Sequence, residues 1–470
     1  MPTPFSVLQP KSPKICRRVI LFTSPLKKVR WDVTMNAKLN FVSILMAFIL
    51  GLVLFDNNLS AQNVLSSRAI EIRGMIVPIL QEKWGLADKI EEGKELLKNS
   101  VSLKFEEVPQ KDKRGRIIKK KGQPVMEMVK KEIALAIFDT ETGEVFEKRY
   151  WLNVAEINKA NDLRKKYLDN PNYLPVFRSS DTTKEFEAIS NWWNSFNSDI
   201  SIIRNGAVGG QYVVVANKYL MSNDDLVYPE DKIGAKYSDI VYVPYSSLLK
   251  DKTLIVAGKK FLNDYVNEAF KELSEAGVMS KAFPDQLITE TMTQTFVKNI
   301  FLTEHTDPMM MFMSNDGGLE LVERVLIRLG TNGEKAFRYT VSKTGASGLG
   351  QIMPKTYASM FKGYSSAKLI KNTDMGRVDV KNGIKAAILV LDDHLLGVKN
   401  RAYSNGSASK RRFDALTPDK LEETRGMAYN GGPGKYNTST GELNIGSRGA
   451  KETAGFLKKF RMIKSLNLFD

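Results

Sequence analysis

Alternating hydrophobic and polar residues mark several short segments in the first half of the chain. The segment 134–152, ALAIFDTETGEVFEKRYWL, contains two β-rich runs that Thr-Glu-Thr-Gly separates. This arrangement predicts a β-hairpin with the polar tetrapeptide at its turn. The segments 211–217 (QYVVVAN) and 239–245 (DIVYVPY) have a similar composition and predict further strands.

Apolar residues at helical intervals precede and follow these strands. In the segment 66–97 they are spaced among charged residues as in a helix, and Pro78 is expected to kink or divide it. A second helix is expected over residues 259–276. The sequence therefore predicts a mixed α and β region, in which we identify no catalytic motif.

The pattern changes at Pro284, beyond which the chain is mainly helical. We therefore expect a multidomain protein with a boundary near 280–285. Residues 62–284 would form a mixed α+β domain of unknown role, and residues 285–470 a mainly α domain. A length of 470 residues agrees with more than one domain.

A buried helical stripe leads directly to a glutamate. Apolar residues recur at every fourth position in the segment that follows Pro284, at Ile288, Met292, Phe296 and Ile300. Glu304 occupies the next step of this stripe. The helix is expected to end soon afterwards, because Pro308 disfavours helix at the residue before it. Glu304 is thus predicted to lie on a buried face in the last helical turn.

A polar, glycine-rich turn lies further along, in the segment 342–357, SKTGASGLGQIMPKTY. Gly345 and Gly348 permit backbone conformations and close approaches that other residues do not. Ser347 offers a hydroxyl and Gln351 an amide, which suit the hydroxyls and N-acetyl groups of a sugar. The Lys-Ser/Thr ending of a phosphate-binding loop is absent from this segment.

Another helix has clear boundaries in the segment LTPDKLEETRGMAYNGG. Thr417 is a typical N-terminal cap and Pro418 suits the first turn. Gly431 and Gly432 are expected to end the helix. Tyr429 therefore falls close to a helix end.

Composition adds a strong positive charge. The formal net charge is +16, which indicates an anionic partner or surroundings. The segment 110–123, QKDKRGRIIKKKGQ, is either a basic patch for an acidic polymer or a solvated hairpin tip. No aromatic residue lies within it, so we expect no nucleic-acid partner.

Cysteine and histidine are scarce. The single cysteine, Cys16, excludes a disulfide within the chain. The only histidines are His305 and His394, which argues against a histidine-rich metal site, and we expect no metal or organic cofactor. His394 borders the apolar stripe of a predicted helix and is expected to be a core-edge or surface residue.

The N-terminal segment resembles an export signal. The run 41–55, FVSILMAFILGLVLF, is uncharged and follows several basic residues. It is short for a membrane span and suits the core of a signal peptide. We expect residues 35–61 to be a signal peptide or an uncleaved membrane anchor, and residues 1–34 to be a misannotated extension before Met35. The chain is then exported to the periplasm or cell envelope, and an anchor would be its only membrane contact.

The segment GASGLGQIMPKTY resembles the signature of soluble-type (SLT) lytic transglycosylases of the lysozyme-like superfamily. A second family element, Ala-Tyr-Asn-x-Gly, is matched by AYNGG from Ala428. The resemblance covers residues 285–460 and implies a lysozyme-like fold that binds peptidoglycan. It implies sugar contacts for the motif residues Ser347, Gln351, Met353, Tyr429 and Asn430.

The family chemistry needs one glutamate that remains protonated, and two residues compete for that role. Glu304 suits it because burial and a helix C-terminus both raise the pKa of a carboxyl. Glu334 is the alternative, since its spacing to the glycine turn matches compact family members. If Glu304 is the acid, residues 309–333 form an insertion with its own helix over LELVERVLIRLG.

The resemblance implies an exported enzyme that cleaves the β-1,4 bond between N-acetylmuramic acid and N-acetylglucosamine. Its product would carry a 1,6-anhydro ring. The alternatives are a hydrolytic muramidase, which delivers water to the same bond, and an inactive lysozyme-like protein that only binds the cell wall.

Overall fold

The computed structural model describes residues 83–166, 177–180, 185–190, 200–204, 207–208, 211–222, 237–245, 247–342 and 344–469. All of them belong to one compact unit, Arg68–Asp470. The predicted extension 1–34 and the predicted signal or anchor 35–61 lie outside the described residues and stay predictions.

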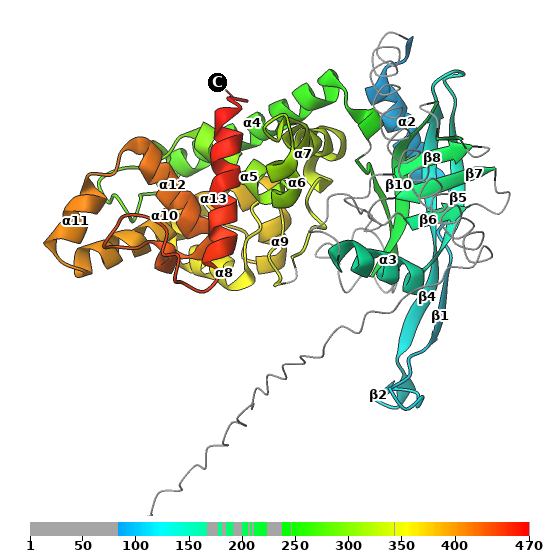
Figure 1. Cartoon of the computed structure of the whole chain (residues 1–470), viewed down its shortest axis with the longest axis horizontal. Coiled ribbons are helices and arrows are strands. Elements are labelled where there is room, and N and C mark those ends of the chain that lie inside the picture. Colours follow the sequence, from blue (N-terminus) through cyan, green and yellow to red (C-terminus); the bar gives the residue numbers. More distant parts are fainter. Residues whose placement is uncertain are drawn as a thin grey trace, which may run out of the picture. The chain divides into compact units, whose positions relative to one another are not determined.

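An antiparallel sheet forms the first part of this unit (Figure 1). Its strands are β1 (Phe105–Pro109), β4 (Met126–Asp139), β5 (Val145–Asn153), β10 (Tyr212–Ser222) and β11 (Tyr237–Tyr242). Strand β4 pairs with β5, β10 and β1, and β10 pairs with β11. The predicted hairpin is confirmed as β4 and β5, with Gly143 at φ 83° in the turn. The two further strand predictions are confirmed as β10 and β11.

The two faces of β4 contribute to different cores, because successive side chains of a strand point to opposite faces. Ile133, Leu135 and Ile137 pack with residues of a second antiparallel sheet. That sheet contains β6 (Phe177–Ser180), β7 (Phe186–Ser190), β8 (Ile200–Arg204) and β9 (Ala207–Val208). Ala134, Ala136 and Phe138 pack on the other face against helix α2 (Leu86–Asn99). Helix α3 (Val154–Lys166) follows β5 directly, and β2 (Lys119–Lys120) pairs with β3 (Gln123–Pro124).

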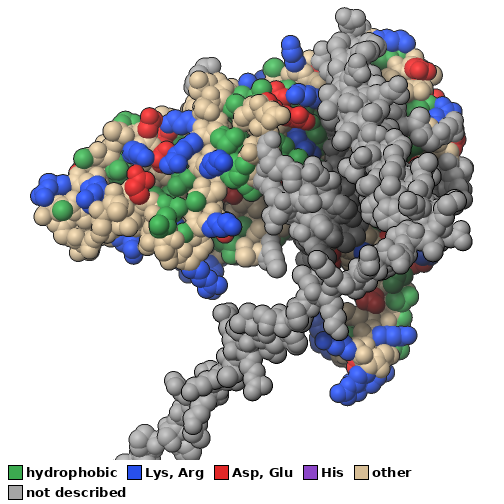
Figure 2. Space-filling view, viewed as in Figure 1, with side chains coloured by type: hydrophobic (Ala, Val, Ile, Leu, Met, Phe, Trp, Pro, Cys, Tyr) green, Lys and Arg blue, Asp and Glu red, His purple; other side chains and the backbone are tan. Residues whose placement is uncertain are grey.

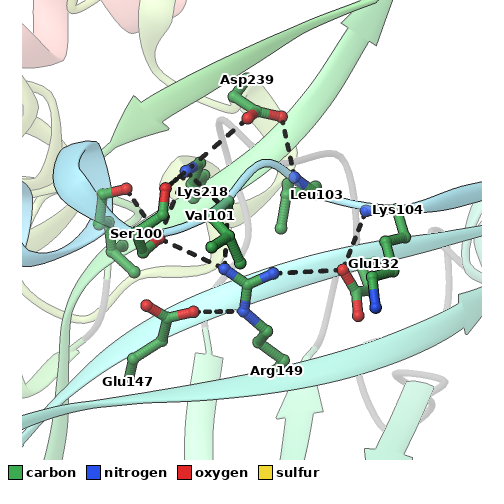
Figure 3. A network of polar contacts seen from close by, with 10 residues as sticks. Ser100, Val101, Leu103, Lys104, Glu132, Glu147, Arg149, Lys218 and Asp239 are labelled. Atoms are coloured by element: carbon green, nitrogen blue, oxygen red, sulfur yellow. Dashed lines mark hydrogen bonds and ion pairs between the residues drawn. The ribbon is translucent and has the colours of Figure 1, made fainter.

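Two cations fix the end of α2 to the sheet (Figure 3). The Lys218 ammonium donates to the carbonyls of Ser100, at 2.9 Å, and Val101, at 3.2 Å. The Arg149 guanidinium donates to the Val101 carbonyl at 2.7 Å and pairs with Glu132 at 3.3 Å. Positive groups stabilise the carbonyl end of a helix, so this network holds the α2–β1 connection on the sheet.

The second part of the unit is mainly helical. Its longer helices are α4 (Lys252–Glu275), α5 (Gln294–His305), α7 (Leu319–Asn332), α8 (Pro354–Gly363), α10 (Val380–Ser404), α12 (Pro418–Gly431) and α13 (Ala450–Ser465). Shorter helices are α6 (Pro308–Met313), α9 (Thr373–Val378) and α11 (Ser407–Asp414). Short 3₁₀ turns are η1 (Ser247–Leu249), η2 (Ile288–Glu290), η3 (Gly333–Lys335), η4 (Ser365–Ala367) and η5 (Pro433–Lys435).

The predicted fold class, a mixed α+β region followed by a mainly α region, is confirmed. Helix α4 covers the predicted 259–276 but begins earlier, where the Asp251 carboxylate caps it by accepting from the Thr253 amide at 2.6 Å. The predicted helix within 309–333 is α7, whose Val322, Leu326 and Leu329 are buried.

Helices α4 and α7 cross unusually closely. A Cβ atom on Gly258 would lie 1.9 Å from the Leu326 carbonyl oxygen, so only glycine fits the crossing. Leu262, Val266 and Leu273 of α4 are buried in the same core as the residues of α5 and α10. Helix α4 thus packs with the helices that follow the predicted boundary near 280–285, which itself stays a prediction.

Membrane crossing requires a long apolar helix. Within the described ranges, no helix has both the length and the apolar character that it needs. The apolar run 41–55 lies outside those ranges.

Candidate active site

Helix α5 places Glu304 in its last turn, as the sequence predicts. Ile300 and Phe296 are buried one and two turns before it, respectively. The start of this helix differs from the prediction, because the Thr293 hydroxyl caps it by accepting from the Phe296 amide at 3.1 Å. Ile288 therefore belongs to the separate turn η2, although it too is buried. The chain leaves the helix at Thr306, two residues before Pro308.

Glu304 lies in the wall of a cavity of about 250 Å³. The predicted site residues Gln351, Met353, Tyr429 and Asn430 line the same cavity. The other residues of its wall are Ser342, Thr344, Ala346, Ile352, Thr356, Val390, His394 and Glu452. The structure therefore brings the glycine turn and the end of α12 together with the Glu304 carboxyl group at the end of α5.

The environment of Glu304 favours its protonated form. Burial raises the pKa of the Glu304 carboxyl to about 7; the Lys459 ammonium opposes this shift and the Glu452 carboxylate adds to it. Lys459 is fixed by the helix that carries the acid, since it donates to the carbonyls of Thr303, at 2.6 Å, and Thr306, at 2.7 Å. A carboxyl with this pKa can both donate and accept a proton near neutral pH.

Tyr429 connects the end of α12 to the glycine turn and lies near Glu304. It lies near the C-terminus of α12, and its hydroxyl donates to the Gly350 carbonyl. Burial and the neighbouring Glu304 raise the pKa of Tyr429 well above its usual range, so the phenol remains protonated. Asn430 follows it, and its side-chain oxygen accepts from the Thr453 hydroxyl at 3.0 Å.

The glycine turn is held in an unusual backbone conformation. Gly345 and Gly348 have φ values of 91° and 73°, and Gln351 has a φ of 47°. The buried Arg377 guanidinium donates to the Gly345 carbonyl at 2.7 Å and the Ile352 carbonyl at 3.1 Å. Gln351 donates from its side-chain nitrogen to the Gly348 carbonyl at 2.8 Å. Residues in rare backbone conformations gather at binding and catalytic sites.

His305 connects the end of α5 to this turn. Its Nε2 atom lies 2.8 Å from the Leu349 carbonyl oxygen, and its ring stacks on Phe337 with 3.7 Å between centroids. Burial and the positive charge of Arg328 lower the pKa of His305 to about 3. The ring is therefore neutral at ordinary pH, and Nε2 carries the proton that it donates to Leu349. His305 therefore ties the end of α5, which carries Glu304, to the glycine turn and does not exchange protons near neutral pH.

Comparison with known families agrees with this geometry. Residues 335–445 match the sequence model of one family, which is described as the transglycosylase SLT domain. The C-terminal region carries an SLT domain. The match indicates peptidoglycan lysis of the lytic transglycosylase type, with peptidoglycan as the substrate. Neither the curated proteins nor the solved structures yielded a match.

The matched interval of the SLT domain contains the glycine turn and Tyr429 but neither candidate glutamate. Glu334 lies in η3 on the exposed surface, where it accepts a hydrogen bond from the Tyr265 hydroxyl at 2.5 Å. It lines a different cavity, between residues of α2, β10, β11 and η3. The structure therefore places Glu304, and not Glu334, beside the family motifs.

Ser347 is the one predicted sugar contact that the cavity wall does not include. The residue is only 1% exposed, and its backbone pairs in both directions with Ile352 inside the glycine turn. Among the described residues its hydroxyl has no hydrogen-bond partner. The serine thus packs inside the turn of the SLT domain.

Sequence reasoning missed three side chains of this site. Glu452 and Lys459 lie on α13, and both act on the pKa of Glu304. Lys459 had a detectable signal, since it lies between the buried residues Phe456 and Phe460. His394, expected at a core edge, lines the cavity, and its Nδ1 atom lies 2.8 Å from the Ala428 carbonyl oxygen. No group of side chains suited to a metal ion occurs in the described part of the chain.

Proposed function

We propose that this chain is an exported peptidoglycan lytic transglycosylase that uses Glu304 as its single catalytic carboxyl group. The supporting observation is the position of Glu304 in a cavity lined by both motifs of the SLT domain. Burial raises the pKa of this carboxyl to about 7, which suits a group that must act first as an acid and then as a base.

The first step breaks the bond between N-acetylmuramic acid and N-acetylglucosamine. The protonated Glu304 gives its proton to the glycosidic oxygen, and the bond from that oxygen to the muramyl anomeric carbon breaks. The N-acetylglucosamine leaves with a free 4-hydroxyl group. The acetamido oxygen of the muramyl residue bonds to its own anomeric carbon and takes up the developing positive charge.

The second step closes the anhydro ring. The ionised Glu304 removes the proton of the muramyl 6-hydroxyl group, and that oxygen attacks the anomeric carbon. The bond from the acetamido oxygen breaks, so the 1,6-anhydro product forms and Glu304 regains its proton. No water enters this reaction, and the chain returns to its starting state.

The remaining cavity residues would bind and orient the glycan. Gln351, Met353 and Asn430 line the wall and present an amide, a thioether and a second amide to the sugar rings. The protonated Tyr429 keeps the turn beside the acid through its bond to Gly350. In this proposal the open part of the cavity holds the glycan strand, and Glu304 of α5 supplies the proton.

Paired glutamate substitutions test the assignment. Glu304→Gln is expected to lower the rate of glycan cleavage by roughly 10²- to 10⁴-fold, because it removes the proton donor. The matched control Glu334→Gln is expected to leave the rate unchanged, since Glu334 lies outside the cavity. Rates are measured as release of soluble muropeptides from purified peptidoglycan.

Two other results would contradict the proposal. Loss of activity in Glu334→Gln alone would transfer the acid role to Glu334. A wild-type chain that binds peptidoglycan without releasing fragments would support the inactive wall-binding alternative.

Glu452 supports a second candidate, the hydrolytic muramidase. Its carboxylate lines the same cavity and could activate a water molecule, as a second carboxylate does in inverting glycosidases. Mass spectrometry of the digest separates the two reactions. Anhydromuramyl ends in both wild type and Glu452→Gln support the transglycosylase, and reducing ends that disappear in Glu452→Gln support the muramidase.

Export is part of the proposal and rests on the apolar run 41–55 and the basic residues before it. The substrate agrees with it, since peptidoglycan lies outside the cytoplasm. Fractionation of cells and N-terminal sequencing of the mature chain test it. A chain found only in the cytoplasm would remove this part of the proposal.

A further inference from the structure

The hairpin of β1 and β4 extends beyond the rest of its sheet (Figure 1). Strand β4 pairs with β5 only from Lys130 onward and with β10 only from Ile133 onward. Its first residues, from Met126, pair with β1 alone. The residues beyond this pair, 110–125, form the part that we call the hairpin tip.

The hairpin tip has a defined backbone. The Asp112 carboxylate accepts from the amides of Arg114, at 2.8 Å, and Arg116, at 3.0 Å. The Gln110 amide donates to the Val125 carbonyl at 2.7 Å. Strands β2 and β3 pair beyond these bonds, and Gly122 at φ 82° lies in the turn between them. The tip is therefore an ordered β-hairpin.

Positive charge dominates the hairpin tip. Seven of its side chains are basic and all seven are exposed: Lys111, Lys113, Arg114, Arg116, Lys119, Lys120 and Lys121. Its single carboxylate, Asp112, is engaged with Arg116 at 2.8 Å. The other six have no acidic partner among the described residues. Figure 2 shows Lys and Arg side chains gathered over this end of the molecule.

Apolar side chains lie among these charges. Ile117 is 46% exposed and Ile118 is 37% exposed, and both directly precede the lysines of β2. Exposure of isoleucine to water is unfavourable, and its transfer to the boundary between lipid headgroups and acyl chains is favourable. A soluble acidic polymer would offer them no such boundary. Nucleic-acid surfaces typically interleave aromatic residues with basic ones, and the tip has no aromatic residue.

We propose that the hairpin tip is a membrane-surface contact. Its lysines and arginines bind the headgroups of anionic phospholipids, and Ile117 and Ile118 enter the layer at headgroup level. Charge complementarity supports this partner, since each basic residue near an anionic bilayer strengthens binding by about 5-fold. The contact is separate from the cleavage reaction and from the predicted anchor 35–61.

Binding of the full chain to lipid vesicles tests the proposal. Vesicles contain phosphatidylcholine alone or mixed with phosphatidylglycerol in equal parts. The hairpin variant carries Lys113→Gln, Arg114→Gln, Lys119→Gln and Lys120→Gln. It is expected to bind the mixed vesicles roughly 500-fold more weakly than wild type, and wild-type binding is expected to weaken at high salt.

A matched variant removes the same charge elsewhere, on α4 and α11. It carries Lys260→Gln, Lys271→Gln, Lys410→Gln and Arg411→Gln, all of them exposed. We expect it to bind like wild type, because both variants keep the N-terminal segment and the same net charge. Thermal unfolding and glycan cleavage should be unchanged in both variants, which shows that neither has misfolded.

Three outcomes would overturn the proposal. The first is wild-type vesicle binding by the hairpin variant, and the second is an equal loss in the matched variant. The third is unchanged vesicle binding together with lost binding to heparin or duplex DNA, which would assign the tip to a soluble polyanion. Ile117→Ser with Ile118→Ser tests insertion, and is expected to weaken binding to the mixed vesicles at high salt. Unchanged binding there would overturn the insertion.

Discussion

Two opposite charges on one helix act on Glu304. Lys459 and Glu452 both belong to α13, but the Lys459 side chain is held in place and the Glu452 side chain is exposed to solvent. Lys459 is buried and its ammonium is tied to two carbonyls of α5, so its distance to the acid is set by the fold. Glu452 is exposed at the cavity wall, where solvent weakens its effect. Burial raises the pKa, and the two neighbours adjust it in opposite directions.

Substitution of these two residues should move the pH profile in opposite directions. In the proposed mechanism Glu304 works in its protonated form, so activity is expected to fall as pH rises through the pKa of Glu304. Glu452→Gln removes a repelling charge, lowers this pKa and moves the falling limb to lower pH. Lys459→Met removes an attracting charge and moves the limb to higher pH. The measurement is kcat/KM for glycan cleavage against pH.

The control for this experiment is Glu320→Gln, on the exposed face of α7, which should leave the profile in place. Lys459→Met also leaves two carbonyls without their donor, at a cost of about 1–3 kcal/mol for each group that stays buried. Urea unfolding measures that cost separately. If the falling limb shifted in the same direction in Glu452→Gln and Lys459→Met, the two charges would not act on Glu304 as proposed.

The sequence predicted the site residues that belong to recognisable local patterns. Glu304 followed from a buried stripe and a helix end, and Tyr429 from the resemblance of AYNGG to the family element Ala-Tyr-Asn-x-Gly. Glu452 could not be predicted, because an exposed glutamate on an amphipathic helix resembles any solvated charge. Ser347 was expected to contact sugar. The motif alone does not show whether this hydroxyl faces the cavity or the inside of the turn.

At the scale of elements, the glycine turn depends on one close approach. A Cβ atom at position 348 would lie 1.9 Å from the Arg377 carbonyl oxygen, which belongs to the backbone and cannot move aside cheaply. A Cβ atom at position 345 would meet nothing within 4 Å. Both glycines have positive φ. The difference between the two positions therefore isolates the steric contact from backbone strain.

Gly348→Ala should thus cost clearly more than Gly345→Ala. The strain of a left-handed alanine is about 1–2 kcal/mol and applies to both variants. The clash adds to it in Gly348→Ala, which should unfold at lower temperature and lose most of its cleavage activity as the turn shifts. Thermal unfolding and cleavage rates of both variants check this. Equal losses in the two variants would show that the turn tolerates a side chain at 348.

Element types were predictable where a pattern persisted over many residues. The alternation in 134–152 identified β4 and β5, and Thr417 with Pro418 identified the start of α12. The predicted start of α5 was wrong, because Ile288 and Met292 are buried at helical spacing but lie before that helix. The sequence did not predict the short strands β7 and β8, because five residues are too few to establish an alternation of apolar and polar positions.

The molecule as a whole depends on α4 for its helical core. Three residues of α4, Leu262, Val266 and Leu273, are completely buried against helices that follow the predicted boundary. Each contributes about 1.5–3 kcal/mol of burial, and net stabilities are only about 5–15 kcal/mol. Helix α4 therefore decides where a stable fragment can begin.

Two fragments test this dependence. A fragment of residues 285–470 lacks α4 and is expected to be insoluble or unfolded, although it contains every residue of the cavity. A fragment of residues 247–470 keeps α4 and is expected to fold and to cleave glycan. Circular dichroism melting and muropeptide release measure the two properties. Cooperative unfolding of the shorter fragment would show that the helices close without α4.

The placement of Lys459 and Glu452 on α13 has a consequence for synthesis of the protein. The acid, the glycine turn and the tyrosine are all translated before α13 emerges from the ribosome. Until Lys459 docks on the carbonyls of Thr303 and Thr306, the end of α5 lacks the two charges that adjust the pKa of Glu304. In the proposed mechanism, Glu304 of a nascent chain therefore stays without these two neighbouring charges until α13 has been made and has docked.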